Sequence, residues 1–373
     1  MAGLYIHIPF CASKCIYCDF YSMAGHSRSI EAYVDALLGE AVARRSEIAE
    51  PMVTIYIGGG TPSLLSAGQM GRLIAGLRRV IDLSQVQEFT VEVNPDDVTQ
   101  PYIEALVELG VNRVSMGIQS FSDADLRLIG RRHTAQQAIE AVHAIKRAGV
   151  GNISIDLIYG LPGQTIDTWQ RNVEQAIGLG VQHISAYSLM WEPGTRLWVM
   201  KQQGRLHEVS DEASVAMELL LAERLRAAGF EHYEISNFGL PGYHSVHNSN
   251  YWNLTPYLGL GAAAHSYDGT VRRHNPANLK QYLANPAASF EAEEEEDWER
   301  YDEYVMLRLR TAEGIDVTQL QSRFPQKFVR HFQREAQALL QSGQLVQSGT
   351  HYRIPENQIM FTDAITRAVM WDE

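Results

Sequence analysis

The sequence predicts an α/β fold in which helices cover a parallel sheet. Short runs rich in β-branched residues alternate with longer amphipathic segments over the first two thirds of the 373 residues. Helical segments of this length between strands imply right-handed crossovers and parallel strands. Polar and glycine-rich stretches such as "GGGTPS" and "YGLPGQT" follow the strand ends, where folds of this class build their sites.

Six β/α units follow one another along the chain, and we expect them to occupy residues 1–235. The predicted strands cover residues 4–8, 53–57, 89–93, 113–117, 153–158 and 184–189. The predicted helices cover roughly residues 30–48, 67–80, 101–109, 135–148, 168–178 and 212–228. Periodicity allows either a doubly wound open sheet or a barrel or partial barrel, and it does not choose between them.

The pattern changes after residue 235. Residues 236–290 are rich in Gly, His and aromatic residues, and we expect a loop-rich extension with short elements. An acidic run over residues 291–304 then opens a helix, as the helix dipole favours. Further helices and the stretch "QLVQSGTHYRI", a hairpin across Gly349, predict a small winged-helix-like domain over residues 291–373.

Composition limits the class of protein. Hydrophobic residues make up 45% and charged residues 20%, which is typical of globular chains. The net charge of −13 argues against a nucleic-acid-binding surface. No apolar run approaches the ~18 residues of a membrane span, and the N-terminal residues lack the basic region of a signal peptide. All three cysteines fall in one cluster rather than in a disulfide framework, so a cytoplasmic location is expected.

The cysteine cluster "CASKCIYC" contains Cys11, Cys15 and Cys18 and follows the first predicted strand. A structural zinc site would need a fourth ligand such as His7, and the four-residue gap would be unusual for it. Inert cysteines would be scattered through the core instead of gathered in one loop. A [4Fe–4S] cluster bound by three thiolates would leave one iron open to a substrate or cofactor.

Together with "GGGTP" after the second strand, the cysteine motif resembles the radical S-adenosylmethionine (SAM) superfamily. The resemblance implies a partial (β/α)6 radical SAM barrel in which the open iron binds the amino and carboxylate groups of SAM. One-electron reduction then cleaves SAM to a 5′-deoxyadenosyl radical in that family. The missing fourth cysteine is thereby explained as the place where SAM binds. The consecutive glycines would let the backbone approach the ligand closely.

Further residues resemble the SAM-contacting set of the coproporphyrinogen III dehydrogenase-like branch. Taken singly, each polar residue at a strand end is equally well explained as a structural ion pair or cap. Glu92 lies in an apolar strand, where an unpaired charge would be costly, and the resemblance implies that Tyr17 packs on adenine. The full set is Tyr5, Tyr17, Gly59, Gly60, Thr61, Glu92, Gln119, Arg131, Asp156 and Met190.

This branch contains the oxygen-independent coproporphyrinogen III dehydrogenases, which decarboxylate propionate side chains oxidatively, and the HemW-type haem chaperones. Two departures weaken the resemblance to the dehydrogenases. Phe20 stands where their motif carries a further cysteine, and the first strand begins at residue 4 without their long preceding segment.

The stretch "HNSNYW" fits the H-N-x-x-Y-W signature of the haem-binding members. The resemblance assigns haem binding to His247, Asn248, Tyr251 and Trp252. An imidazole can ligate haem iron, and the two aromatic rings offer flat apolar surface to a porphyrin. His244 and His265 are further candidates for axial ligation. The alternative is that His247 and Asn248 cap a turn while the aromatic residues belong to the core.

We therefore expect a haem chaperone that binds a [4Fe–4S] cluster, SAM and haem and passes haem to an acceptor protein. The resemblance implies a respiratory-chain acceptor with at most transient membrane contact, and it leaves a homodimer and enzymatic activity open. The alternative function is that of a coproporphyrinogen III dehydrogenase. A third class, a pure protein-binding module, would leave the residues of the SAM set unexplained.

Overall fold

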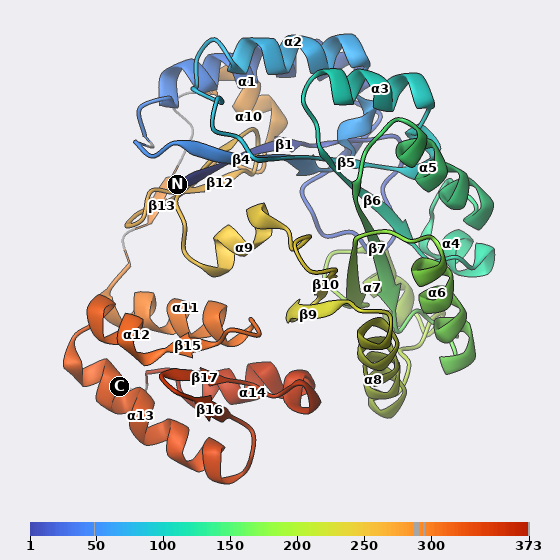
Figure 1. The fold of residues 1–373 in the computed structure, drawn as a ribbon. Helices are drawn as coiled ribbons and strands as arrows, with labels where there is room; N and C mark the ends of the chain where they lie inside the picture. Colours follow the sequence, from blue (N-terminus) through green and yellow to red (C-terminus); the bar gives the residue numbers. More distant parts are fainter. Residues whose placement is uncertain (48, 287–290, 294, 372–373) are drawn as a thin grey trace.

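The computed structural model describes residues 1–47, 49–286, 291–293 and 295–371. Its main feature is a curved sheet with the strand order β14-β13-β12-β11-β1-β4-β5-β6-β7-β8-β10-β9 in the described residues (Figure 1). The central parallel strands are β1 (Ala2–Ile8), β4 (Met52–Gly59), β5 (Glu88–Val93), β6 (Arg113–Gln119), β7 (Asn152–Tyr159) and β8 (His183–Ser188). The six predicted strands are thus confirmed.

The strand order distinguishes between the two architectures that periodicity allows. Each central strand pairs with the next one in the chain, whereas a doubly wound sheet reverses its direction at a switch point. Winding in one direction with right-handed crossovers places the helices on one face, and Figure 1 shows them on the outer side of the curve. These helices are α1 (Ile30–Arg44), α2 (Ala67–Leu77), α3 (Gln100–Glu108), α5 (Ala135–Arg147), α6 (Ile166–Gly178) and α8 (Asp211–Ala227). The predicted partial barrel is confirmed.

Local sequence explains where these elements begin. The central strands are buried along almost their whole length, because parallel strands in such folds are covered on both faces. Capping boxes at Ser66, Thr134 and Thr165 start α2, α5 and α6. The structure also contains α4 (Asp123–Ile129) and α7 (Arg196–Gln202), which the sequence analysis did not predict. Each has only seven residues, too few for a clear helical period.

Residues 236–290, for which the sequence indicates a loop-rich extension, contain short strands that lengthen the sheet at both edges. On the β8 side lies β10 (Asn237–Gly239), which also pairs with β9 (Glu231–Glu234), a strand that comes just before this region. On the β1 side lie β11 (Tyr257–Leu260), β12 (His265–Tyr267) and β13 (Arg272–His274). Two helices, α9 (Val246–Trp252) and α10 (Leu279–Ala284), complete this region. Strands of three or four residues are too short to show a period of two.

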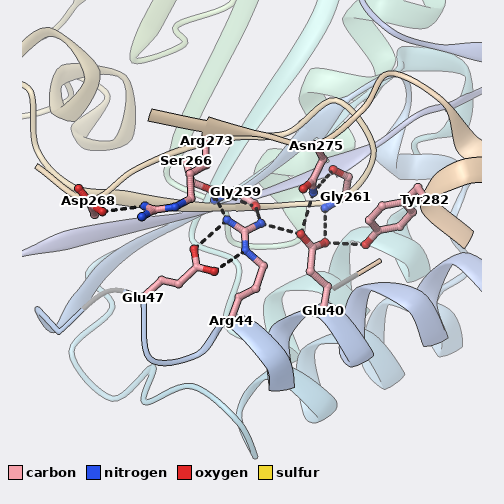
Figure 2. A network of polar contacts seen from close by, with 10 residues as sticks. All are labelled: Glu40, Arg44, Glu47, Gly259, Gly261, Ser266, Asp268, Arg273, Asn275 and Tyr282. Atoms are coloured by element: carbon pink, nitrogen blue, oxygen red, sulfur yellow. Dashed lines mark hydrogen bonds and ion pairs between the residues drawn. The ribbon is translucent and has the colours of Figure 1, made fainter. Parts of the chain in front are cut away.

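A buried polar network ties this added edge to the barrel (Figure 2). Glu40 and Arg44 on α1 form an ion pair at 2.6 Å with almost no exposure to solvent. Arg44 also donates to the Gly259 carbonyl at 3.0 Å and to the Ser266 hydroxyl at 2.9 Å. The Tyr282 hydroxyl donates to Glu40 at 2.7 Å. These contacts fix β11, β12 and α10 against α1.

The C-terminal part forms a separate core, as the winged-helix prediction requires. A small sheet with the order β15-β17-β16 packs with the helices, and Gly349 turns the hairpin with φ +61°. The elements are α11 (Asp297–Leu309), β15 (Ile315–Asp316), α12 (Val317–Arg323), α13 (Gln326–Gln341), β16 (Val346–Ser348), β17 (His351–Arg353) and α14 (Thr362–Arg367).

The acidic run differs from the prediction in its first residues. Instead of opening the helix, Glu291–Glu293 form β14, which pairs with β13 at the sheet edge. The helix α11 begins at Asp297, where Glu296 and Glu299 form a capping box. Glu294 lies outside the described residues. Backbone pairing with β13 therefore outweighs the preference of acidic residues for a helix start in this segment.

Backbone contacts join the C-terminal domain to the free edge of β9. The Ile235 N–H donates to the Arg310 carbonyl at 2.9 Å, and the Ala312 N–H donates to the Tyr233 carbonyl at 3.0 Å. Glu234 and Thr311 form a single antiparallel bridge. The short added segment thus covers an edge strand that would otherwise expose unpaired backbone groups. Within the described residues, no helix is both long and apolar enough to cross a membrane.

Candidate functional site

The cysteine loop lies at the carboxyl end of β1. It is closed by a short parallel pair between β2 (Phe10–Cys11) and β3 (Met23–Ala24). Cys11, Cys15 and Cys18 are free thiols of intermediate exposure. Because parallel strands end at the same edge, the segments that follow β4, β5 and β6 meet this loop. The loop therefore stands over the open end of the barrel.

Each cysteine sulfur has a polar partner from a different place in the chain. The Thr61 hydroxyl donates to Cys11 Sγ and the Arg131 guanidinium donates to Cys15 Sγ, both at 3.5 Å. Ser22 Oγ lies 4.0 Å from Cys18 Sγ. Hydrogen bonds to the sulfurs tune iron–sulfur clusters. The donor set around the three thiols therefore fits a cluster, whose thiolates bind separate irons.

Described side chains of His, Cys, Asp and Glu do not gather anywhere in groups of three that could hold a single metal ion.

A network below the cysteine loop connects these donors. The Asn94 amide donates to Thr61 Oγ1 at 3.2 Å, and Arg131 donates to Asn94 Oδ1 at 2.8 Å. Arg131 also donates to the Gly117 carbonyl. Asn94 was not among the predicted site residues, although its place directly after β5 in "NPDD" is a usable signal.

The glycine motif contains two positions, Gly59 and Gly60, at which close packing leaves no room for a side chain. The sequence did not indicate this requirement. Gly59 has φ +111°, and a Cβ there would stand 2.6 Å from the His7 ring. A Cβ at Gly60 would stand 2.8 Å from the Phe10 carbonyl oxygen. Both contacts are too close for any side chain. The glycines therefore let the turn after β4 pack against the neighbouring β1 and the loop that follows it.

Two carboxyl groups face the inside of the barrel. Glu92 accepts from the Tyr56 hydroxyl at 2.7 Å and from the Gly59 N–H at 3.1 Å. Burial raises the pKa of Glu92 to about 7, and nearby Asp156 adds to the shift. Burial also raises the pKa of Asp156 to about 6, although Ser185 and Arg113 act in the opposite direction. Both groups can exchange a proton near neutral pH and can bind a ligand that donates hydrogen bonds.

The remaining residues of the predicted SAM set lie in different surroundings. Gln119 has φ +72° at an irregularity of β6, a strained conformation that often occurs at functional sites. Tyr17 is half-buried against a small apolar cluster, where burial and the neighbouring Cys15 raise its pKa. The Tyr5 hydroxyl is bonded to His7 Nδ1 at 2.9 Å. Met190 is 63% exposed.

The motif helix α9 lies at the opposite end of the central strands, inside the curve of the sheet (Figure 1). Its first N–H groups, those of Val246 and His247, donate to the Glu88 carboxylate at 2.9 and 2.8 Å. Glu88 is the first residue of β5, and Thr54, near the start of β4, bonds His247 Nδ1 at 2.8 Å. The cysteines and the "HNSNYW" motif are therefore not brought together.

Both ring nitrogens of His247 are occupied. Nδ1 is bonded to Thr54, and Nε2 is bonded to the Tyr251 hydroxyl at 2.9 Å. The residue is only 1% exposed, and burial together with Arg113 lowers its pKa to about 3. The imidazole is therefore neutral and can ligate iron only after one of these hydrogen bonds breaks.

The other motif residues, Asn248, Tyr251 and Trp252, are half-buried. Of these three, Tyr251 lines a cavity of about 230 Å³ together with Tyr257, Tyr267, Arg272 and Glu303, among others.

His244 and His265 are the two further candidates for axial ligation. His265 lies in β12, and His244 lies between β10 and α9. The His244 ring stacks on Tyr233 with centroids 4.1 Å apart, and His244 pairs with Glu231 at 2.8 Å. His265 is exposed and stacks on His274 across β12 and β13 at 5.5 Å. Neither histidine lies in α9.

A line of side chains connects the two ends of the barrel through its interior. The His247 ring stacks on Tyr56 at 5.1 Å, and the Tyr56 hydroxyl donates to Glu92. Tyr56 and Thr54 were not among the predicted site residues. Their spacing by two residues in β4 places them on one face of the strand, which is the signal that could have identified them.

Comparisons with known proteins concern the family and the fold of the chain. Residues 5–176 match the model of the Radical SAM superfamily, and residues 296–361 match that of the HemN C-terminal domain. In overall structure the chain is similar to coproporphyrinogen III oxidase (HemN) from Escherichia coli, with a TM-score of 0.85 at 21% identity. That match covers 99% of this chain and 90% of the other.

Sequence comparison finds similarity over nearly the whole chain to proteins named "Heme chaperone HemW". The protein from Lactococcus lactis is 38% identical, over 90% of this chain and 88% of its own length. That from Bacillus subtilis is 37% identical, over 88% of each chain. That from Escherichia coli is 37% identical, over 73% of this chain and 72% of its own.

Proposed function

The chain belongs to the HemW haem chaperone family of the radical SAM superfamily, and on this basis we propose that it binds haem and passes it to an acceptor protein. The observation that carries the proposal is the identity of 37–38% to proteins of this name over most of both chains. The whole "HNSNYW" signature lies on one helix, α9, which supports the proposal of haem binding.

We propose that Cys11, Cys15 and Cys18 hold a [4Fe–4S] cluster and that SAM binds its fourth iron. The free thiols and their three polar partners support this assignment. Bound cluster and SAM would supply one-electron chemistry. The residues proposed to contact SAM are Tyr5, Tyr17, Gly59, Gly60, Thr61, Glu92, Gln119, Arg131, Asp156 and Met190. Among them Glu92 and Asp156 would accept hydrogen bonds from SAM, and Thr61 and Arg131 would hold the cysteine sulfurs.

For haem we propose a site at α9 formed by His247, Asn248, Tyr251 and Trp252. Tyr251 would release His247 Nε2, the ring nitrogen that the hydroxyl now occupies. Thr54 would keep its hydrogen bond to Nδ1 and so fix the orientation of the ring. Partners of the second ring nitrogen have this role in other metal sites.

The position of α9 also supports a role in transfer. Arg308 on α11 donates to Asn253 at the end of α9, so the motif helix contacts both the barrel and the C-terminal domain. We propose that residues 1–235 carry the cluster, residues 236–290 carry the haem motif, and residues 291–373 form a winged-helix-like domain. A respiratory-chain acceptor, and a homodimer, are part of this proposal.

The first test is a titration of the anaerobically reconstituted protein with haem, followed by the Soret band. We expect one haem per chain and loss of most binding in His247→Ala. The control is His143→Ala, which changes an exposed histidine on α5. Unchanged haem binding in His247→Ala would place the site elsewhere, and His244→Ala and His265→Ala would then be compared.

The second test distinguishes a haem chaperone from a coproporphyrinogen III dehydrogenase. The reconstituted protein is incubated anaerobically with coproporphyrinogen III, SAM and an electron donor. We expect no protoporphyrinogen at enzymatic turnover, and haem transfer to an apo-cytochrome acceptor in a parallel assay. Sustained protoporphyrinogen formation would overturn the chaperone proposal.

A further inference from the structure

A second cavity lies at the seam between the barrel and the C-terminal domain. Its volume is about 290 Å³. One side of its lining comes from α8, β9 and β10, and the other side comes from the end of α11, from β17 and from the 3-10 helix η4 (Glu356–Phe361). Among the described residues, neither the cysteines nor α9 contribute to the lining, so the cavity is separate from the sites discussed above.

The lining consists mainly of apolar side chains. They are Ala222, Phe230, Phe238, Leu309, Ile354 and Ile359. The oxygens of Glu234 and Nδ1 of His232 are buried, and Asn237 and Ser236 stabilise the Glu234 carboxylate by hydrogen bonds, so these polar atoms are not reached from the cavity. A ligand in this space would therefore contact hydrocarbon, and burial of its own apolar surface would favour binding.

Three arginine side chains line the same cavity and come from three different segments. Arg226 lies on α8, Arg310 directly follows α11, and Arg353 is the last residue of β17. Arg353 is exposed, and its guanidinium makes no ion pair or hydrogen bond within the part of the chain that the structure describes. One positive group at the cavity is thus left without a partner there.

The other two arginines use only part of their hydrogen-bonding capacity. Arg226 contacts Glu356 through Nη2, and Arg310 donates through Nη2 to Asp363 at 2.8 Å. Arg226 is 60% exposed and Asp363 is 73% exposed, and ion pairs so open to water contribute little to stability. Because a guanidinium carries five N–H donors, the Nε and Nη1 groups of both arginines remain available to a further anion.

The exposed carboxylates of the lining already have partners. Glu356 contacts Arg226, and Glu231 pairs with His244 at 2.8 Å. Within the described residues, the cavity therefore presents unused N–H donors but no unpaired carboxylate that a ligand can reach. This arrangement favours an anion over a cation, because hydrogen bonds from arginine to a carboxylate are roughly twice as strong as those between neutral groups.

We propose that this cavity binds a small organic anion, a carboxylate on an apolar body about the size of a benzene ring. The carboxylate would accept hydrogen bonds from Arg353 and from the unused donors of Arg226. The body would pack against the apolar lining, which includes Phe230 and Ile354. Because Arg226 belongs to the barrel and Arg353 to the C-terminal domain, the anion would link the two domains across the seam. The proposal does not depend on haem binding.

The test is a fluorine NMR titration of the full chain with 4-fluorobenzoate, 4-fluorobenzamide and 4-fluorobenzamidine, which share a ring and carry a negative, a neutral and a positive group. We expect 4-fluorobenzoate to bind at least about tenfold more tightly than the other two, because only its carboxylate accepts charge-assisted hydrogen bonds from arginine. Fluoroacetate has a carboxylate without the ring, so it should also bind at least about tenfold more weakly than 4-fluorobenzoate.

Two variants and a control locate the site. Arg353→Gln should weaken the binding of 4-fluorobenzoate at least about fivefold. Arg226→Gln should weaken it at least about threefold, because the anion contacts the barrel as well as the C-terminal domain. Arg330→Gln removes the same charge from an exposed position on α13 outside the lining, and it should leave the affinity within about twofold.

Arg226, Arg330 and Arg353 are all exposed, so the variants should fold, and thermal unfolding measured in parallel checks this. Equal binding of the three ring probes, tighter binding of 4-fluorobenzamidine, unchanged binding in Arg353→Gln, or no binding of any probe would overturn the proposal. Unchanged binding in Arg226→Gln would overturn the link across the seam. These titrations require neither haem nor the cluster, so this proposal and that of haem binding fail independently.

Discussion

Glu40 and Arg44 lie one turn apart on α1 and form an ion pair at 2.6 Å that is almost completely enclosed by protein. The pair does more than stabilise α1. Glu40 accepts hydrogen bonds from the Gly261 N–H at 2.8 Å and from the Asn275 amide at 2.7 Å, both in the segment added after the barrel. The added segment is therefore anchored by a buried pair of charges.

The first prediction concerns this pair. Glu40→Gln leaves the buried Arg44 guanidinium without its closest counter-charge, and breaking a buried pair in this way costs about 3–5 kcal/mol. Glu47, which also contacts Arg44 at 2.9 Å, should keep the loss near about 3 kcal/mol. Urea unfolding followed by circular dichroism measures the change. The exposed pair of Arg72 and Asp35 provides the control, since Asp35→Asn should cost less than about 1 kcal/mol. Equal losses would contradict the argument.

The second prediction concerns the cluster. Thr61→Val keeps the shape of the side chain and removes the hydroxyl that donates to Cys11 Sγ at 3.5 Å. A reduced cluster carries more negative charge, so loss of a donor should lower the reduction potential. A hydrogen bond of ~1 kcal/mol corresponds to roughly 40 mV for one electron. Redox titration followed by electron paramagnetic resonance measures the shift, while iron content should stay constant. Cys15→Ala, in contrast, should abolish the cluster signal.

The third prediction concerns Glu92 and pH. The pKa of this carboxyl is about 7 in the folded chain, above its usual value of 4.5. Between these two values the folded state keeps a proton that the unfolded state has released, so Glu92 lowers stability as pH rises through this window. Glu92→Gln should therefore be more stable than the wild type by up to about 3 kcal/mol at pH 8, and by much less at pH 5.

Urea unfolding of the protein without SAM at both pH values measures the effect of Glu92→Gln. The surface variant Glu108→Gln on α3 serves as the reference for a change at an exposed carboxylate. A gain in stability for Glu92→Gln that is larger at pH 5 than at pH 8 would contradict this prediction.

The fourth prediction concerns the haem motif. Tyr251→Phe keeps the aromatic face and removes the hydroxyl that occupies His247 Nε2. If this nitrogen ligates iron, haem binding no longer has to break a hydrogen bond of ~1 kcal/mol, and the affinity should rise about fivefold. Soret titration of the two proteins measures the ratio. Weaker binding in Tyr251→Phe would mean that the hydroxyl itself contacts haem.

Several features of the fold could be predicted because their signals are local. The six β/α units follow from alternating apolar runs and capping residues such as Ser66 and Thr134. The C-terminal hairpin follows from Gly349. Short elements such as α4 and β11 could not be predicted, because three to seven residues contain too little periodicity to separate strand from helix or loop.

For the candidate site, too, some features could be predicted from the sequence and others could not. The sequence by itself determined which residues carry chemistry, since thiols, carboxylates and a motif histidine are recognisable by type and spacing. Only the tertiary structure decided that Arg131 and Thr61 reach the cysteine sulfurs, and that His247 lies at the far end of the barrel with both nitrogens bonded. Such contacts join residues that are distant in the chain. Their partners are selected by how strands pair and helices pack, which no local pattern specifies.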